Sequence, residues 1–234
     1  MNLQLYTTKL TEIYGPERAA EAAARLARLA ERYRGRITPP ADSALTQRDS
    51  ILITYGDQVQ EAGRPPLQTL AEFSEQHLAG VVSGIHILPF YPWSSDDGFS
   101  VKDYRAVDPS LGSWEDVERL GRSFRLMYDG VINHASVQGE WFQAFLRDEP
   151  PFRDYFLTVE GSPGLSGVVR PRALPLLTEF QTAAGPRRVW TTFSDDQADL
   201  DYHNPDVLLE IFDILLMYAL RVAQFIRLDA IAYL

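Results

Sequence analysis

Phe225-Ile-Arg-Leu-Asp-Ala-Ile-Ala-Tyr-Leu234 is the stretch that says most about how this chain folds. An apolar run leads into Arg227 and, two residues later, into Asp229. Alternate residues of a strand point to the same side, so both charged side chains are predicted to leave the strand together. Barrel enzymes keep their catalytic groups at the carboxyl ends of such strands. The alternative is an ordinary ion pair with a structural role.

The composition is that of an ordinary globular chain. It has 234 residues, of which 45% are hydrophobic and 23% charged, with a formal net charge of -10. A nucleic-acid-binding protein normally presents a basic face, so DNA and RNA are unexpected partners. No apolar run approaches the ~18 residues of a membrane span, and the first residues lack the pattern of a signal peptide. The absence of cysteine excludes disulfides and thiolate metal sites, so we expect a cytoplasmic protein.

Short apolar runs alternate with helical patterns along the chain. Buried strands are predicted at 51–54, 84–88, 125–132 and 224–229, and helices at 16–34, 67–78, from Ser113 onward and at 205–220. This alternation is typical of a parallel sheet covered by helices. The helix at 16–34 is expected to cap the N-terminal side of the domain. The helix at 205–220 is apolar nearly all round, so we expect it to be largely buried.

The alternation stops between Ser136 and Pro205. This segment is rich in proline, glycine and aromatic residues, and so long an excursion is rarely a plain loop. We therefore predict a partial barrel formed by residues 1–135 and 204–234, with a small irregular subdomain at 136–203 inserted after the third strand.

Polar clusters follow three consecutive predicted strands. Pro89-Phe-Tyr-Pro-Trp-Ser-Ser-Asp-Asp-Gly-Phe-Ser-Val-Lys-Asp-Tyr104 combines aromatic faces with a pair of acids, which suits a sugar, although its local composition favours a simple turn. Asp129-Gly-Val-Ile-Asn-His134 follows the third strand, where a single histidine is more often structural than catalytic. Arg227 and Asp229 end the fourth. Three such clusters at neighbouring strand ends favour one shared site.

The clusters together resemble a known family. Asp129-Gly-Val-Ile-Asn-His134 resembles the Asp-x-Val-x-Asn-His signature of the α-amylase superfamily (glycoside hydrolase family 13), and the stretch from Arg227 to Tyr233 resembles its nucleophile strand. The stretches 88–100 and 189–197 resemble the sucrose-phosphorylase branch, which includes phosphorylases of glucosylglycerol, glucosylglycerate and sucrose 6-phosphate. The resemblance covers nearly all of the chain from about Ile51 onward.

The resemblance implies an α/β fold of the TIM (β/α)8 barrel family, here only its first half of about four βα units. It makes Asp229 the nucleophile and Arg227 the group that holds this carboxylate ionised. It also implies substrate-binding residues: Asp96 and His134 for hydroxyls of the donor glucose, Phe99 and Tyr233 along the same subsite, and Asp129 beneath it. One departure is Gly130, where the family usually has a larger residue.

The implied activity is that of a glucoside phosphorylase. A covalent glucosyl-enzyme on Asp229 would be resolved by inorganic phosphate, a co-substrate, giving α-glucose 1-phosphate without a cofactor or metal. The partner would be a small sugar such as sucrose or a related α-glucoside, and the oligomeric state stays open. Family members continue to a general-acid Glu and a stabilising Asp, so this chain alone is expected to be inactive. The alternatives are a hydrolase or transglucosidase of the same superfamily, or a non-enzymatic remnant.

Overall fold

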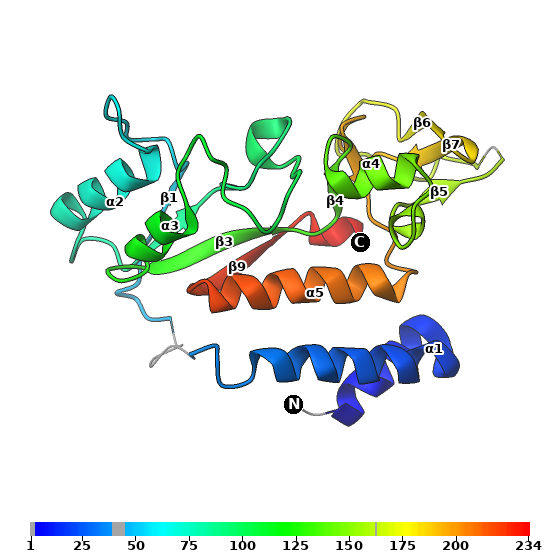
Figure 1. The fold of residues 1–234 in the computed structure, drawn as a ribbon, viewed down its shortest axis with the longest axis horizontal. Coiled ribbons are helices and arrows are strands. Elements are labelled where there is room, and N and C mark those ends of the chain that lie inside the picture. Colours follow the sequence, from blue (N-terminus) through cyan, green and yellow to red (C-terminus); the bar gives the residue numbers. More distant parts are fainter. Residues whose placement is uncertain (1–2, 39–44, 162) are drawn as a thin grey trace.

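The computed structural model describes residues 3–38, 45–161 and 163–234 (Figure 1). The helices are α1 (Leu3–Tyr33), α2 (Pro66–His77), α3 (Trp114–Leu120), α4 (Glu140–Leu146) and α5 (Pro205–Leu220). The strands are β1 (Ile51–Thr54), β2 (Gly84–Ile87), β3 (Arg125–Val131), β4 (His134–Ser136), β5 (Thr158–Val159), β6 (Leu177–Thr182), β7 (Gly185–Trp190), β8 (Gln197–Asp199) and β9 (Ala223–Asp229). None of the described helices has the length and apolar character needed to cross a membrane.

The central sheet has four parallel strands in the order β1-β2-β3-β9. The predicted strands are confirmed to within a residue at each end. All of β2 is buried, as a strand covered on both faces requires. The two outer strands expose apolar side chains, since Ile53 of β1 is 63% exposed and Leu228 of β9 is 41% exposed.

Two helices begin at capping residues. Ser113 and Asp116 form a reciprocal capping box at the start of α3. Asn204 caps α5 by accepting a hydrogen bond from the backbone N–H of Asp206, and Pro205 occupies the first helical position. These local signals set where each helix begins.

Helix α5 lies between the sheet and α1, as Figure 1 shows. Every residue of α5 is at least partly buried, which agrees with its apolar sequence. Its inner face packs on β9, and its outer face is covered by α1. The expectation that the first helix caps the N-terminal side of the domain is therefore wrong. An all-round apolar helix needs cover on both sides, and α1 supplies the second.

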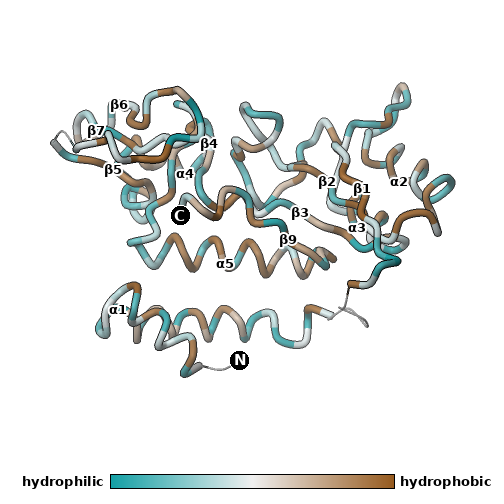
Figure 2. Tube along the Cα trace, turned by 180° about the vertical axis from the view of Figure 1, so that it is seen from behind, coloured by the Kyte–Doolittle hydropathy of each residue, from teal (hydrophilic) through white to brown (hydrophobic). Residues whose placement is uncertain are grey.

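Helix α1 consists of two helical segments that meet at Gly15 and Pro16. Gly15 has φ 77 and ψ 165, outside helical values, and the proline that follows cannot complete the helical hydrogen-bond ladder. The predicted helix from Pro16 matches the second segment, while the first, with its mixed polar and apolar residues (Figure 2), was not foreseen from the sequence.

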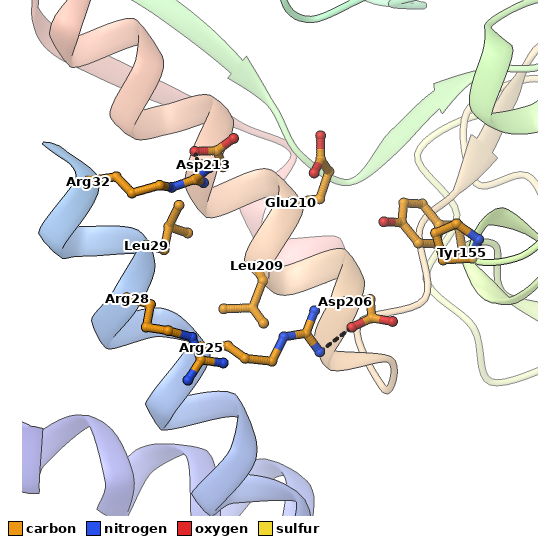
Figure 3. A pocket seen from close by; sticks show the side chains of 10 residues that line it. Arg25, Arg28, Leu29, Arg32, Tyr155, Asp206, Leu209, Glu210 and Asp213 are labelled. Atoms are coloured by element: carbon orange, nitrogen blue, oxygen red, sulfur yellow. Dashed lines mark hydrogen bonds and ion pairs between the residues drawn. The ribbon is translucent and has the colours of Figure 1, made fainter.

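Charged and apolar contacts hold α1 against α5 (Figure 3). Leu26 of α1 and Leu209 of α5 belong to one buried cluster. An Arg25 guanidinium nitrogen lies 2.5 Å from an Asp206 carboxylate oxygen, and Arg32 lies 3.0 Å from Asp213. A cavity of about 710 Å³ opens beside these pairs. Because Arg25 and Arg32 pair with carboxylates of α5 across the gap, we attribute the charge of these side chains to the pairing of the two helices.

Gly130 of β3 lies directly beneath α5. A Cβ atom built there would lie 3.2 Å from side-chain atoms of Ile226 and Leu215 and 3.3 Å from Leu228. Those side chains fill the space that a larger residue would take, so the departure from the family pattern has a packing explanation.

The segment predicted to be irregular contains regular elements. Strands β5, β7 and β6 form an antiparallel sheet, and β4 pairs with β8. Strands β6 and β7 form a tight hairpin, whereas β4 and β8 bring together the two ends of the inserted segment, from His134 to Asp199. The predicted domain ranges include residues 1–2, 39–44 and 162, which lie outside the described residues.

We predict that Leu26→Ala lowers the free energy of unfolding by about 2–4 kcal/mol, because it opens a cavity between α1 and α5. The matched control is Ile13→Ala on the same helix, where the side chain is 63% exposed and a change below about 0.5 kcal/mol is expected. Urea unfolding followed by circular dichroism measures both. Equal losses in the two variants would contradict the packing of α1 on α5.

Candidate active site

The polar segments that follow β2, β3 and β9 meet at one edge of the sheet. These strands are neighbours and parallel, so their carboxyl ends lie side by side. In Figure 1 the chain end at Leu234 and strand β4 lie at that same edge. The site therefore combines residues that are far apart in the sequence.

Asp129, near the end of β3, is a buried carboxylate that contacts residues of both neighbouring strands. Its side chain is fully buried, and its Oδ2 lies 2.7 Å from Nε2 of His86 on β2. The Arg227 guanidinium donates through Nη1 to Asp129 Oδ1 at 2.5 Å. The Tyr91 hydroxyl donates to the Asp129 carbonyl at 3.1 Å. A buried carboxylate must be paired, and these contacts tie it to both neighbouring strands.

Arg227 is shared between two carboxylates. Its Nη2 lies 2.9 Å from Asp229 Oδ1, while Nη1 is held by Asp129. Burial raises the pKa of Asp229, Arg227 acts to lower it, and the charge of Asp129 raises it. The pKa of Asp229 is raised overall. Arg227 therefore acts in the direction that the family resemblance implies, but burial outweighs it.

Asp96 lies in the short turn after β2 and faces the inserted segment. The Arg172 guanidinium donates through Nη2 to both carboxylate oxygens of Asp96, at 2.8 and 3.0 Å. The Gln197 side chain donates to Asp96 Oδ2 at 3.1 Å. Asp96 is partly exposed, so its carboxylate is open to exchange one of these donors for a ligand.

His134 is almost fully buried, with 1% of its surface exposed. Its Nε2 lies 2.9 Å from the Phe99 carbonyl and 3.1 Å from Gln197 Nε2. Burial lowers the pKa of His134 to about 4, against the opposing effects of the Phe99 carbonyl and Asp96. The imidazole is therefore neutral near pH 7, and its ring contacts Phe193 with centroids 5.1 Å apart.

Two aromatic residues complete the predicted set. The Arg227 guanidinium lies 5.8 Å from the centroid of the Phe99 ring, within the range of a cation–π contact. Tyr233 is 38% exposed and packs edge-on against Phe193 at 5.4 Å. Both rings line the edge where the charged groups gather.

The predicted residues fall into two groups joined by Phe99. One contains Asp129, Arg227 and Asp229, and the other contains Asp96 and His134. The Phe99 carbonyl contacts His134 while its ring contacts Arg227. The charge of Asp96 also acts to raise the pKa of Asp229, which shows that the groups are electrostatically coupled.

Sequence reasoning missed four residues that contact the predicted ones: His86, Arg172, Phe193 and Gln197. His86 left a usable signal, because it is the single polar side chain in the buried strand β2. Arg172 gave no such signal, since its segment shows neither the helical nor the strand pattern of apolar residues. Among the described residues, no group of three or more His, Cys, Asp or Glu side chains is placed to hold a metal ion.

Comparison with known proteins gives consistent matches. The family model of the alpha-amylase catalytic domain matches residues 78–234. The glucosylglycerate phosphorylase of Spirochaeta thermophila is 53% identical over 231 residues, which are 96% of this chain and 39% of the relative. The sucrose phosphorylase of Agrobacterium vitis is 36% identical over 78% of this chain and 39% of its own length.

A solved structure agrees in fold. Sucrose 6F-phosphate phosphorylase from Thermoanaerobacter thermosaccharolyticum aligns with a TM-score of 0.70 and 29% identity, covering 82% of this chain and 41% of that one. The chain thus spans about two fifths of the length of the relatives it matches.

The buried His134 predicts a pH-dependent stability. Its pKa of about 4 in the folded state lies below its ordinary value of 6.5, so only the unfolded chain takes up this proton as the pH falls between those values. Stability from this group is present above about pH 6.5 and is lost towards about pH 4, a change of about 3 kcal/mol. Asp199 acts with the opposite sign, because burial raises its pKa to about 7.

We therefore expect the stability difference between the wild type and His134→Gln to shrink by about 3 kcal/mol from about pH 7 to about pH 4. Urea unfolding at each pH measures it. The control is Ile13→Ala, which changes no titratable group at a side chain that is 63% exposed, so its difference should stay constant. A difference for His134→Gln that is equally constant would mean that the imidazole is not held neutral.

Proposed function

Because the chain belongs to the alpha-amylase family, in its branch of glucosylglycerate and sucrose phosphorylases, we propose that it carries the nucleophile half of a retaining α-glucoside phosphorylase site. The chain spans about two fifths of its relatives, so the activity is proposed for the protein at the full length of its gene. The observation that carries the proposal is the Arg227–Asp229 pair at the end of β9, beside Asp96 and His134.

In the proposed mechanism, the Asp229 carboxylate attacks the anomeric carbon of the donor glucose as the glycosidic oxygen leaves. The product is a covalent glucosyl-enzyme, which phosphate then attacks to give α-glucose 1-phosphate and free Asp229. A retaining site places a second carboxyl group about 5 Å from the nucleophile to protonate the leaving oxygen. We do not assign that proton donor to a residue of this chain.

The remaining residues would bind the sugar. Asp96 is partly exposed and already accepts from two donors, so it suits hydroxyl groups. His134 is neutral because of burial, and a sugar hydroxyl that bound its Nε2 would take the place of the Phe99 carbonyl or of Gln197. Phe99 and Tyr233 would stack against the C–H faces of the ring. Asp129, which is fully buried, would support the site by holding Arg227.

We also propose that the four-stranded sheet is part of a closed (β/α)8 barrel. The exposed apolar side chains of Ile53 on β1 and Leu228 on β9 are what open edges of an interrupted barrel would present. Within it, residues 1–135 and 204–234 would belong to the barrel, and 136–203 to a small inserted subdomain that contributes Arg172 and Gln197.

For the substrate we favour glucosylglycerate over sucrose. The glucosylglycerate phosphorylase is more similar in sequence and matches 96% of this chain, against 78% for the sucrose phosphorylase. Phosphate as the second substrate is supported by the relatives, which are named as phosphorylases. The guanidinium groups of Arg172 and Arg227 are both paired with carboxylates, so a phosphate that binds them would have to replace one of these partners.

We predict that Asp229→Asn in the full-length protein lowers the rate of phosphorolysis by more than about 10³-fold, because an amide is a poor nucleophile. Release of glucose 1-phosphate from glucosylglycerate, with phosphate present, is the measurement. The exposed Asp57 provides the control, and Asp57→Asn should leave the rate within about twofold. Full activity of Asp229→Asn would assign the nucleophile elsewhere.

We further predict that kcat/KM for phosphorolysis is at least about tenfold higher with glucosylglycerate than with sucrose, which corresponds to about 1.4 kcal/mol of transition-state binding. The two substrates are compared at equal phosphate concentrations. Turnover that continues unchanged without phosphate would identify a hydrolase or transglucosidase instead. A higher kcat/KM with sucrose would contradict the proposed substrate and would indicate a sucrose phosphorylase instead.

A further inference from the structure

The turn that carries Asp96 is held by a carboxylate that the proposed mechanism does not use. Asp196 precedes β8, and its Oδ2 accepts hydrogen bonds from the hydroxyls of Ser94 at 2.6 Å, of Ser95, and of Ser100 at 2.8 Å. The hydroxyl of Ser136 lies 2.6 Å from that of Ser94. Because a carboxylate only accepts, the three serine hydroxyls all donate towards one oxygen atom.

These serines flank a strained turn. Asp96 and Asp97 have φ of 57 and 50, and Gly98 has φ of 100. Consecutive left-handed residues other than glycine are uncommon and persist only where the surroundings fix them. Ser95 precedes the turn and Ser100 follows it, with the Ser100 N–H donating to the Ser95 carbonyl at 3.2 Å. One oxygen of Asp196 therefore holds both ends of the turn.

The residue after Asp196 holds the carboxylate within the turn. Gln197 donates to Asp96 Oδ2 at 3.1 Å and lies 3.1 Å from His134 Nε2. The consecutive side chains of Asp196 and Gln197 thus hold, respectively, the two ends of the turn and the Asp96 carboxylate within it. We propose that Asp196 is a positioning residue that keeps the Asp96 carboxylate at the donor-sugar site. The proposal rests on the proposed function, because that function is what assigns Asp96 to the sugar.

The two carboxylate oxygens of Asp196 are used unequally. The second oxygen of Asp196, Oδ1, is buried without a hydrogen-bond partner among the described residues, and an unpaired buried acceptor is costly. The three serine hydroxyls that donate to the other oxygen, Oδ2, hold the turn in one conformation. The adjacent Asp195 is exposed, which gives a matched control of the same residue type.

The test uses the full-length protein and phosphorolysis of glucosylglycerate. Asp196→Ala should raise KM at least about tenfold, the loss expected from about one charged hydrogen bond, while kcat falls less. Asp196→Asn should lie between Asp196→Ala and the wild type, because its amide oxygen still accepts, and it carries the test if Asp196→Ala does not fold. Asp195→Asn should match the wild type.

A double-mutant cycle separates positioning from a general structural role. If Asp196 acts through Asp96, adding Asp196→Ala to Asp96→Asn should cost less than about twofold in kcat/KM. Losses that simply multiply would overturn the proposal, as would an unchanged KM in Asp196→Ala.

Hydrogen exchange distinguishes failure of this proposal from failure of the proposed function. The Ser100 amide should exchange at least about tenfold faster in Asp196→Ala and unchanged in Asp195→Asn, because the turn opens locally. If the wild type phosphorolyses no α-glucoside, the proposed function is wrong, and exchange still shows whether Asp196 fixes the turn. Unchanged exchange in Asp196→Ala overturns the positioning role whatever the activity.

Discussion

The buried carboxylate of Asp129 sets the relation between three strands. It lies on β3, accepts from Arg227 on β9 and contacts His86 on β2. A fully buried anion without partners is strongly unfavourable, and a shift of one residue in either pairing would turn one partner to the other face. Asp129 and Arg227 are register partners in the sheet. The charge that the core must neutralise therefore also specifies how the strands align.

The same pairing sets the electrostatics of Asp229. Arg227 is held closest by Asp129 and only in part by Asp229. Burial is the largest cause of the raised pKa of Asp229, Arg227 acts against it, and repulsion by the charge of Asp129 adds to it. The structural anchor and the tuning of the proposed nucleophile are thus one feature, which is why Asp129 cannot be regarded as a support residue alone.

The elements that local sequence determines were predicted well. The four strands are short apolar runs with clear ends, and the caps at Ser113 and Asn204 are formed by neighbouring residues. The position of α1 was not predictable, because an apolar stripe does not reveal which surface it covers. Gln197 and Asp96 are separated by 101 residues, and no local pattern encodes such a contact. The strand-end residues were found because parallel strands bring their carboxyl ends together.

The sheet and the inserted segment contribute differently to the site. Strands β3 and β9 place Asp129, Arg227 and Asp229 on rigid backbone, where pairing fixes their spacing. Asp96 has no such support, since it lies in a left-handed turn outside the sheet. Its position depends on Asp196 and Gln197. These residues lie near Asp96 because β8 pairs with β4, the strand that follows β3 in the chain. The segment between β3 and α5 therefore supplies the side chains that hold Asp96, and the position of the Asp96 carboxylate depends on how firmly that segment is anchored to the sheet.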